Sequence, residues 1–130
     1  MDSSELEAIK RFSDLIAVRQ YGTGSFILGE PTQEDREAAA AGFAEVKEAV
    51  ASRDYDLVIL DEINVAMRLS LISVDEVLEL IETRPHHVEL VLTGRNADAR
   101  IVERADLVTE MREVKHYYTQ GVQARKGIER

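Results

Sequence analysis

Hydrophobic residues recur along the chain with two spacings, one typical of helices and one of buried strands. The clearest helix follows Thr32, a residue type that caps helix N-termini. Its apolar positions, which would form one buried stripe, are Ala39, Phe43, Val46 and Val50. The capping box from Ser73 to Glu76 predicts a second helix, which Pro85 would end. Shorter helices are expected after Ser3 or Ser4, over 64–69 and over 98–105.

Continuous apolar runs without alternation predict strands that are buried on both faces. Such a run is Leu57 to Leu60, and Val88 to Leu92 is the next predicted strand along the chain. Weaker strands are predicted over Leu15 to Tyr21 and over Leu107 to Met111. Because strands alternate with helices, we expect crossover connections and a mostly parallel sheet with flanking helices. The predicted fold class is α/β, in a single domain over residues 1–130.

The composition narrows the class of protein. The chain has 130 residues, 45% of them apolar, which is enough for a hydrophobic core. Its formal net charge of −9 argues against a nucleic-acid partner, because phosphate binding needs clustered Lys and Arg. The absence of cysteine excludes a disulfide framework and a thiolate metal site. No apolar run approaches the ~20 residues of a membrane span, and the N-terminus lacks signal-peptide features, so we expect a cytoplasmic protein.

Two predicted strands end in polar residues, at the edge of an α/β sheet where ligands bind. Asp61 and Glu62 follow Leu60, and an apolar strand that ends in acids is the Walker B arrangement for holding Mg²⁺ near phosphates. The alternative is that one of these acids only caps the following turn. Arg95 follows the other strand after a glycine and could bind the same phosphates, or it could be a surface residue of that turn.

Other candidate groups are weaker, and one expected element is missing. His86 and His87 have no acids or cysteines at metal-ligand spacing, so we expect solvated turn residues. His116 stands between Lys115 and two tyrosines, although a lone histidine is usually structural. The chain contains no G-x-x-x-x-G-K-[ST] motif, so it would offer a metal ligand without the backbone amides that hold phosphates.

Several stretches, in order and over nearly the whole chain, resemble one family, the P-loop-type ATP:corrinoid (cob(I)alamin) adenosyltransferases. The matching stretches are Glu5 to Arg11, Gly24 to Ile27, Leu60 to Asn64, Leu92 to Arg95, Ala105 to Met111, Val114 to His116 and Ala124 to Glu129. The resemblance implies part of a RecA-like P-loop NTPase domain. It also implies transfer of the 5′-deoxyadenosyl group of ATP to the cobalt of a reduced corrinoid, in cobalamin biosynthesis.

The resemblance also assigns residues, cofactors and partners. Glu62 would be the magnesium ligand, with Asp61 beside it, and Arg95 would lie near the triphosphate or the corrinoid. Phe26 matches an aromatic residue of the loop that covers the corrin face, and His116 is a further candidate for cofactor binding. The implied cofactors are Mg²⁺ and ATP, with a corrinoid as substrate. Family members are commonly homodimers.

The chain also departs from the family pattern. The family begins with a strand, the phosphate loop, a helix and a second strand, and the residues here match the later part of the family pattern. The corrin-facing loop lacks the tryptophan of many relatives, since the chain has none. We therefore expect the chain alone to be a poor enzyme, with the phosphate loop supplied by another chain, by a dimer mate or not at all. The alternative function is a non-catalytic remnant that binds a corrinoid or a partner protein.

Overall fold

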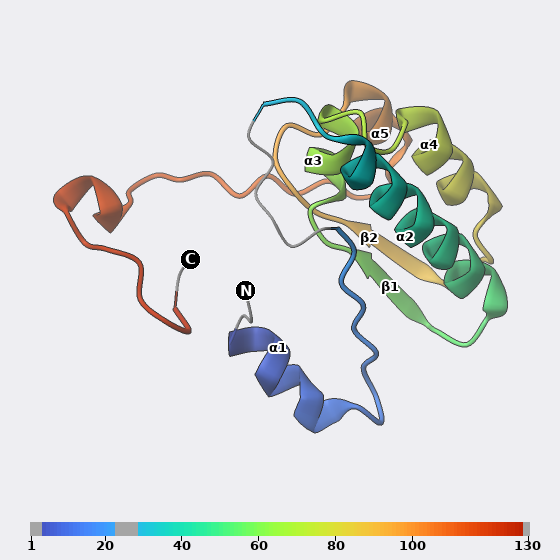
Figure 1. Cartoon of the computed structure of the whole chain (residues 1–130), viewed down its shortest axis with the longest axis horizontal. Coiled ribbons are helices and arrows are strands. Elements are labelled where there is room, and N and C mark those ends of the chain that lie inside the picture. Colours follow the sequence, from blue (N-terminus) through green and yellow to red (C-terminus); the bar gives the residue numbers. More distant parts are fainter. Residues whose placement is uncertain (1–3, 23–28, 129–130) are drawn as a thin grey trace. The chain divides into compact units, whose positions relative to one another are not determined.

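A computed structural model describes residues 4–22 and 29–128, which belong to two compact units (Figure 1). The larger unit, Tyr21–Val108, holds all the strands of the described residues. Its elements are α2 (Gln33–Ser52), β1 (Leu57–Leu60), α3 (Ile63–Arg68), α4 (Val74–Thr83), β2 (Glu89–Leu92) and α5 (Ala99–Arg104). The other unit, Met1–Gln20 with Thr109–Arg130, holds α1 (Ser4–Ile9) and two 3₁₀ turns, Lys10–Phe12 and Tyr117–Gln120.

The larger unit is α/β, as predicted. Strands β1 and β2 pair in parallel, with Leu57 opposite Glu89 and Leu60 opposite Leu92. The chain between them forms α3 and α4, so the crossover connection that parallel strands need is helical. Helix α2 runs alongside the strand pair (Figure 1).

The two long helices begin where the sequence predicts. At α2, the Thr32 hydroxyl accepts from the Asp35 N–H at 3.1 Å, and the Asp35 carboxylate accepts from the Thr32 N–H at 2.8 Å. At α4, Ser73 and Glu76 form the same reciprocal pair. Each box satisfies two N–H groups that the first helical turn would otherwise leave unpaired. Helix α4 ends at Thr83, before Pro85, as expected.

One hydrophobic core joins the helices to one face of the strands. Its buried members come from the four helices, from the strand end and from the loop before α4, and they are Phe43, Val50, Leu60, Ile63, Met67, Ile72, Val77, Leu80 and Ile101. Val58, Leu90 and Leu92 pack against it, as do Ala39 and Val46 of the predicted stripe. The stripe on α2 is therefore confirmed.

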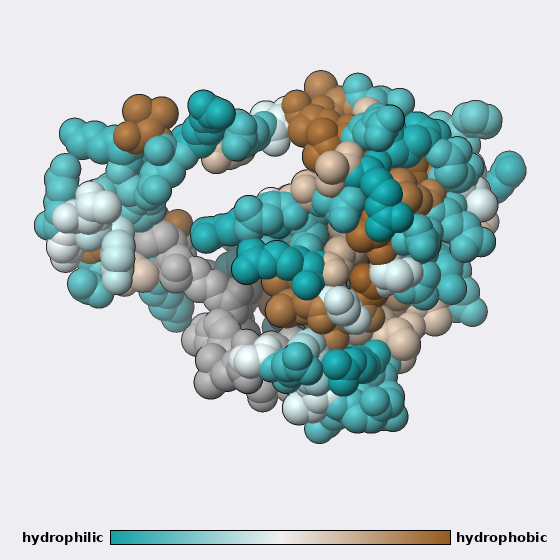
Figure 2. Space-filling view, turned by 90° about the horizontal axis from the view of Figure 1, so that it is seen from above, coloured by the Kyte–Doolittle hydropathy of each residue, from teal (hydrophilic) through white to brown (hydrophobic). Residues whose placement is uncertain are grey.

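The prediction that Leu57–Leu60 is buried on both faces is wrong for the described residues. Leu57 and Ile59 are 52% and 57% exposed, and Val91 of β2 is 41% exposed. Successive side chains of a strand point to opposite faces, and the core takes only Val58 and Leu60 of β1. The sheet thus has an apolar outward face, and hydrophobic side chains appear among hydrophilic ones on the surface of this unit (Figure 2).

Two further predictions are corrected. Residues 15–21 and 107–111 are not strands, and within the described chain the only ladder joins β1 to β2. A strand exists only where a neighbour accepts and donates its backbone hydrogen bonds, and neither segment has such a neighbour. Leu107 and Met111 are accordingly 85% and 93% exposed. None of the described helices has the length and apolar character that a bilayer span needs.

Tyr21, at the end of the first of these segments, packs instead on α2. Its ring lies so close to Gly42 that a Cβ there would stand 2.5 Å from the Tyr21 Cγ, and its hydroxyl donates to Glu45 at 2.8 Å. Glycine weakens a helix interior by about 1 kcal/mol relative to alanine. The absence of a side chain at Gly42 leaves the space that the Tyr21 ring occupies.

We predict that Gly42→Ala destabilises the protein, although alanine is the better helix former. Overpacking costs about 1–3 kcal/mol, which exceeds the gain of about 1 kcal/mol in helix propensity. In a Tyr21→Ala background the sign should reverse, and Gly42→Ala should stabilise by about 1 kcal/mol. Urea unfolding of the wild type, Gly42→Ala, Tyr21→Ala and the double variant measures these free-energy changes. Ala41→Gly, at an exposed position, is the control and should destabilise equally in both backgrounds; a stabilising Gly42→Ala in the wild-type background would contradict the packing account.

A second prediction concerns the cap of α4. The pKa of Glu76 is lowered, first because the Ser73 N–H donates to its carboxylate and then because the Ser73 hydroxyl does so. A lowered pKa in the folded state adds stability that is complete above the ordinary value of 4.5 and is lost as the pH falls through the lowered value. Glu76→Gln should therefore cost at most about 1 kcal/mol at neutral pH, since the site is exposed to solvent. This cost should shrink in acid.

Unfolding free energies between pH 7 and pH 3 measure the effect. Glu79→Gln, one turn further along α4, is the matched control, because no N-cap group donates to that carboxylate. An equal cost of Glu76→Gln at both ends of the pH range would exclude the charge as its source.

Candidate active site at the strand ends

The polar residues that follow β1 and β2 lie together. Because the strands are parallel and Leu60 is opposite Leu92, their next residues, Asp61 and Thr93, come side by side. The Thr93 N–H continues the ladder by donating to the Leu60 carbonyl at 3.2 Å. The two strand ends therefore meet, and the candidate site consists of residues 61–64 and 93–95.

The Thr93 hydroxyl links the two strand ends. It donates to Asp61 Oδ1 at 2.7 Å and accepts from the Glu62 N–H at 3.0 Å. The Thr93 carbonyl accepts from the Asn64 N–H at 3.3 Å. Thr93 was not among the predicted site residues. The signal for it in the sequence was a hydroxyl residue directly after a predicted strand, and the register sets that residue opposite Asp61.

Glu62 lies in an unusual backbone conformation. Its φ of 60° and ψ of 21° place it in the left-handed region, which a residue with a Cβ rarely adopts. Its carbonyl accepts from the N–H groups of Val65 and Ala66 and so starts α3. Its side chain makes no capping hydrogen bond, and within the described residues its carboxylate has no hydrogen bond or ion pair. Glu62 therefore presents an exposed carboxylate beyond the strand end.

The two acids differ in their surroundings. Asp61 has one carboxylate oxygen bound to the Thr93 hydroxyl, while the Glu62 carboxylate is unengaged among the described residues. Turn capping by the side chain of Glu62, the alternative from the sequence, does not occur.

Asn64 and Gly94 pack tightly under this turn. Asn64 is 7% exposed, and its Oδ1 has no hydrogen-bond partner within the described chain. Gly94 has a φ of 131°, and a Cβ on it would lie 2.9 Å from the Asn64 Cβ. Only glycine allows both this backbone conformation and this approach. The Thr93–Gly94 turn thereby closes onto the start of α3.

The other predicted site residues are placed differently. Arg95 follows Gly94, is exposed, and makes no ion pair among the described residues. His116 belongs to the other unit, where its Nδ1 accepts from the Tyr118 N–H at 3.0 Å and so caps the 3₁₀ turn Tyr117–Gln120. Phe26 lies outside the described residues. His86 and His87 lie in an exposed turn, as expected.

A magnesium ion would find only a partial shell in this part of the chain. The described residues contain no group of three or more His, Cys, Asp or Glu that could hold a metal. Mg²⁺ takes oxygen ligands, keeps several waters and often relies on one or two carboxylates plus substrate phosphates. An exposed carboxylate at a strand end fits that pattern, with the remaining oxygens coming from elsewhere.

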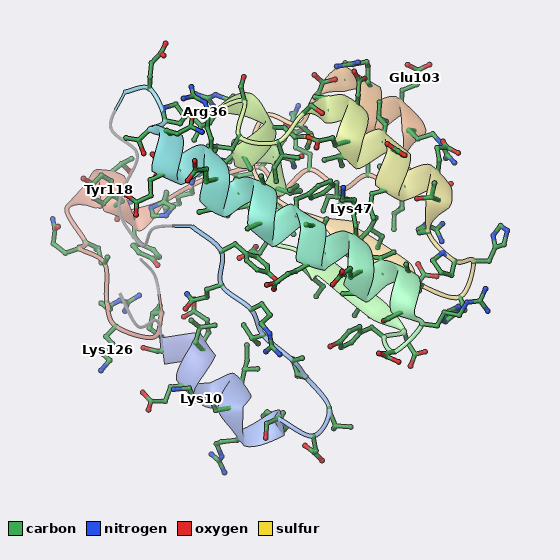
Figure 3. The ribbon with its side chains drawn as sticks, turned by 45° about the vertical axis from the view of Figure 1, so that its right-hand side comes forward. Lys10, Arg36, Lys47, Glu103, Tyr118 and Lys126 are labelled. Atoms are coloured by element: carbon green, nitrogen blue, oxygen red, sulfur yellow. The ribbon has the colours of Figure 1, made fainter. Side chains whose placement is uncertain are left out.

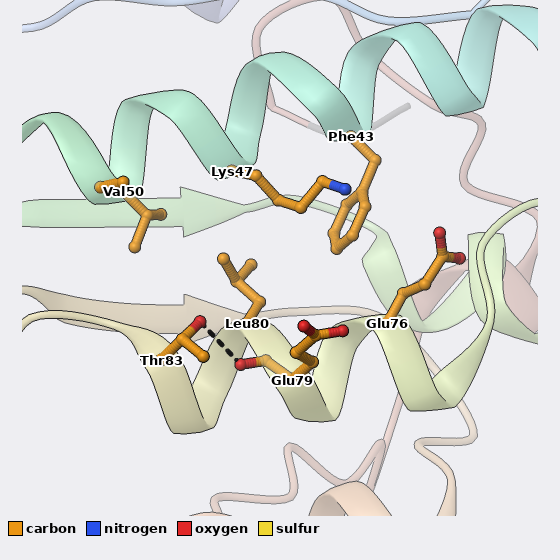
Figure 4. A pocket seen from close by; sticks show the side chains of 8 residues that line it. Phe43, Lys47, Val50, Glu76, Glu79, Leu80 and Thr83 are labelled. Atoms are coloured by element: carbon orange, nitrogen blue, oxygen red, sulfur yellow. Dashed lines mark hydrogen bonds between the residues drawn. The ribbon is translucent and has the colours of Figure 1, made fainter.

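A separate hollow lies between α2 and α4, away from the strand ends. It measures about 230 Å³ and is lined by Phe43, Lys47, Val50, Ala51, Glu76, Glu79, Leu80 and Thr83. Lys47 extends from α2 (Figure 3) and lies beside the Phe43 ring, with its Nζ 5.6 Å from the ring centroid (Figure 4). Because the hollow is lined by side chains of α2 and α4 and by none of the strand-end residues, we interpret it as a gap in the packing of these two helices.

Comparison with known proteins identifies the family. The family described as ATP:corrinoid adenosyltransferase BtuR/CobO/CobP matches residues 1–130. A corrinoid adenosyltransferase of a Sinorhizobium species is 37% identical over 99% of this chain and 61% of its own length. That of Pseudomonas aeruginosa is 36% identical over 92% of this chain and 59% of its own length, and that of Escherichia coli is 35% identical over 74% and 51%.

The chain therefore spans about three fifths or less of the length of these relatives. Their shared name, the family match over all 130 residues and the acid-ended strand beside a Thr-Gly-Arg turn agree with one another. The chain belongs to the ATP:corrinoid adenosyltransferase family.

Proposed function

We propose that this chain supplies the metal-binding and corrinoid-facing part of an enzyme that transfers the 5′-deoxyadenosyl group of ATP to the cobalt of a reduced corrinoid. The observation that carries the proposal is the exposed carboxylate of Glu62 beyond β1, beside an Asp61 that Thr93 holds. The family membership supplies the reaction, and the strand-end position is where α/β sheets bind ligands.

In this proposal each site residue has one task. Bound Mg²⁺ would neutralise negative charge on the triphosphate as it departs. Glu62 would hold the metal, and the exposed guanidinium of Arg95, on the adjoining turn, would bind phosphate oxygens. Phe26 would cover the corrin face and exclude water from the cobalt, and His116 would contribute to binding the corrinoid or the nucleotide.

The proposal includes a phosphate loop that this sequence does not contain. Backbone N–H groups of a glycine-rich loop are what hold ATP phosphates in such sites, and one or two carboxylates cannot replace them. We therefore propose that the chain by itself is incompetent, and that a polypeptide segment with a G-x-x-x-x-G-K-[ST] loop completes the site.

The test is adenosylcobalamin formation from ATP, Mg²⁺ and chemically reduced cobalamin. The chain alone should give no product, and adding a polypeptide segment with the G-x-x-x-x-G-K-[ST] loop should restore product formation. Glu62→Gln should lower the restored rate by more than the roughly 10- to 100-fold typical of an outer-shell partner. Glu79→Gln, on α4, is the control and should match the wild type.

Absence of product in both arrangements would contradict the enzymatic proposal. The alternative, a non-catalytic remnant that binds a corrinoid, is favoured by the missing loop alone. Titration with cobalamin, followed by visible absorption, separates the two. Binding that does not depend on ATP, without turnover in either arrangement, would establish the alternative.

We also propose that the chain self-associates as a homodimer. The outward face of the sheet exposes Leu57, Ile59 and Val91, and β1 and β2 are bonded only to each other among the described residues. Exposed apolar strands with unpaired edges favour pairing with another chain. A symmetric dimer is the simplest closed assembly that would cover them.

Sedimentation equilibrium at low micromolar concentration should show a dimer. Ile59→Ser, on the outward face, should shift the equilibrium towards monomer, because it removes apolar area from the interface. Val102→Ser, at a 42% exposed position of α5, is the matched control and should leave the dimer unchanged. A monomer that melts cooperatively, or equal effects of the two substitutions, would refute this proposal.

A further inference from the structure

The Thr93 hydroxyl forms hydrogen bonds with two consecutive acidic residues, Asp61 and Glu62. It gives its only proton to Asp61 Oδ1 at 2.7 Å and takes the N–H of Glu62 at 3.0 Å. A hydroxyl that both donates and accepts is fixed in rotation, and each bond polarises the other. The side chain of one residue at the end of β2 therefore sets the position of two consecutive acids at the end of β1.

The left-handed backbone of Glu62 needs such a restraint. A residue with a Cβ adopts a φ of 60° only where its surroundings hold it there. Two groups hold it on opposite sides: the Thr93 hydroxyl binds its N–H, while the N–H groups of Val65 and Ala66 bind its carbonyl. The turn directs the chain from β1 into α3, and it leaves the Glu62 carboxylate without a partner in the described chain.

We propose that Thr93 is a positioning residue for Glu62, with Asp61 as its hydrogen-bonded support and Glu62 as the carboxylate that meets the metal. This inference rests on the proposed function and divides between the two acids a role that the sequence assigned to both. Asp61 acts through Thr93: it stabilises the turn after β1 and does not bind the metal ion. The packing of Gly94 against Asn64 keeps the Thr93 backbone close enough for this arrangement.

The first test uses hydrogen exchange in the full chain, measured by NMR. Thr93→Val keeps the shape of the side chain and removes the hydroxyl, and Thr93→Ser keeps the hydroxyl. Exchange of the Glu62 N–H should accelerate roughly tenfold in Thr93→Val and stay near wild type in Thr93→Ser. The reference is the Glu76 N–H, which is bound to the Ser73 hydroxyl in the same way, so that the ratio of the two rates cancels a global loss of stability. An unchanged ratio in Thr93→Val overturns the inference.

The second test follows the magnesium requirement of the completed enzyme. Thr93→Val should raise the Mg²⁺ concentration for half-maximal rate roughly 10-fold or more, and Thr93→Ser should restore it. Asp61→Asn should raise this concentration less than Glu62→Gln does, since an amide oxygen still accepts from the Thr93 hydroxyl. If Asp61→Asn raises the requirement as much as Glu62→Gln, Asp61 is itself a ligand and the division of roles is wrong.

The two tests separate failure of this inference from failure of the proposed function. If the completed enzyme forms no adenosylcobalamin, the proposed function fails, and the exchange ratio still decides whether Thr93 holds Glu62. If product forms and the magnesium requirement of Thr93→Val equals that of the wild type, the function stands and the positioning role is refuted.

Discussion

The parallel pairing of β1 with β2 is the contact on which the rest of the candidate site depends. Four residues of each strand lie opposite one another, and the ladder extends to the hydrogen bond between the Thr93 N–H and the Leu60 carbonyl. Because both strands run the same way and end at the same level, Asp61 and Thr93 become neighbours although they are 32 positions apart in the chain. A shift of one residue would turn every side chain of a strand to its other face and separate Thr93 from Asp61.

A pair of four-residue strands does not hold itself together in water. The helices supply the missing stability, because their buried residues and the inward residues of both strands share one core. The capping boxes of α2 and α4 begin these helices at defined positions, and Gly42 gives up helix propensity so that Tyr21 can dock. The arrangement of the strand ends therefore depends on the packing of the helices on one side of the sheet.

The turn after β1 shows how a tightly restrained backbone can leave one functional group accessible. Glu62 has a left-handed backbone whose N–H and carbonyl are both bonded, whereas its carboxylate is exposed and unengaged among the described residues. Asp61, its neighbour, has lost part of that freedom to Thr93. Two adjacent acids of similar chemistry acquire different roles in this proposal because a single hydroxyl from the other strand contacts them differently.

Local sequence was sufficient for the features that depend on neighbours along the chain. Helices α2 and α4, their caps, the stripe from Ala39 to Val50 and the acids after β1 follow from local chemistry and periodicity. The family could also be read from the residues, because its motifs are short and ordered.

Tertiary contacts settled the features that depend on distant partners. The segment ending at Tyr21 and the one starting at Leu107 have strand composition but no neighbour to bond with, and the outward face of β1 has no cover in the described chain. The role of Thr93 could not be predicted from the sequence either, since its hydroxyl contacts Asp61 only because the register places the two residues opposite each other.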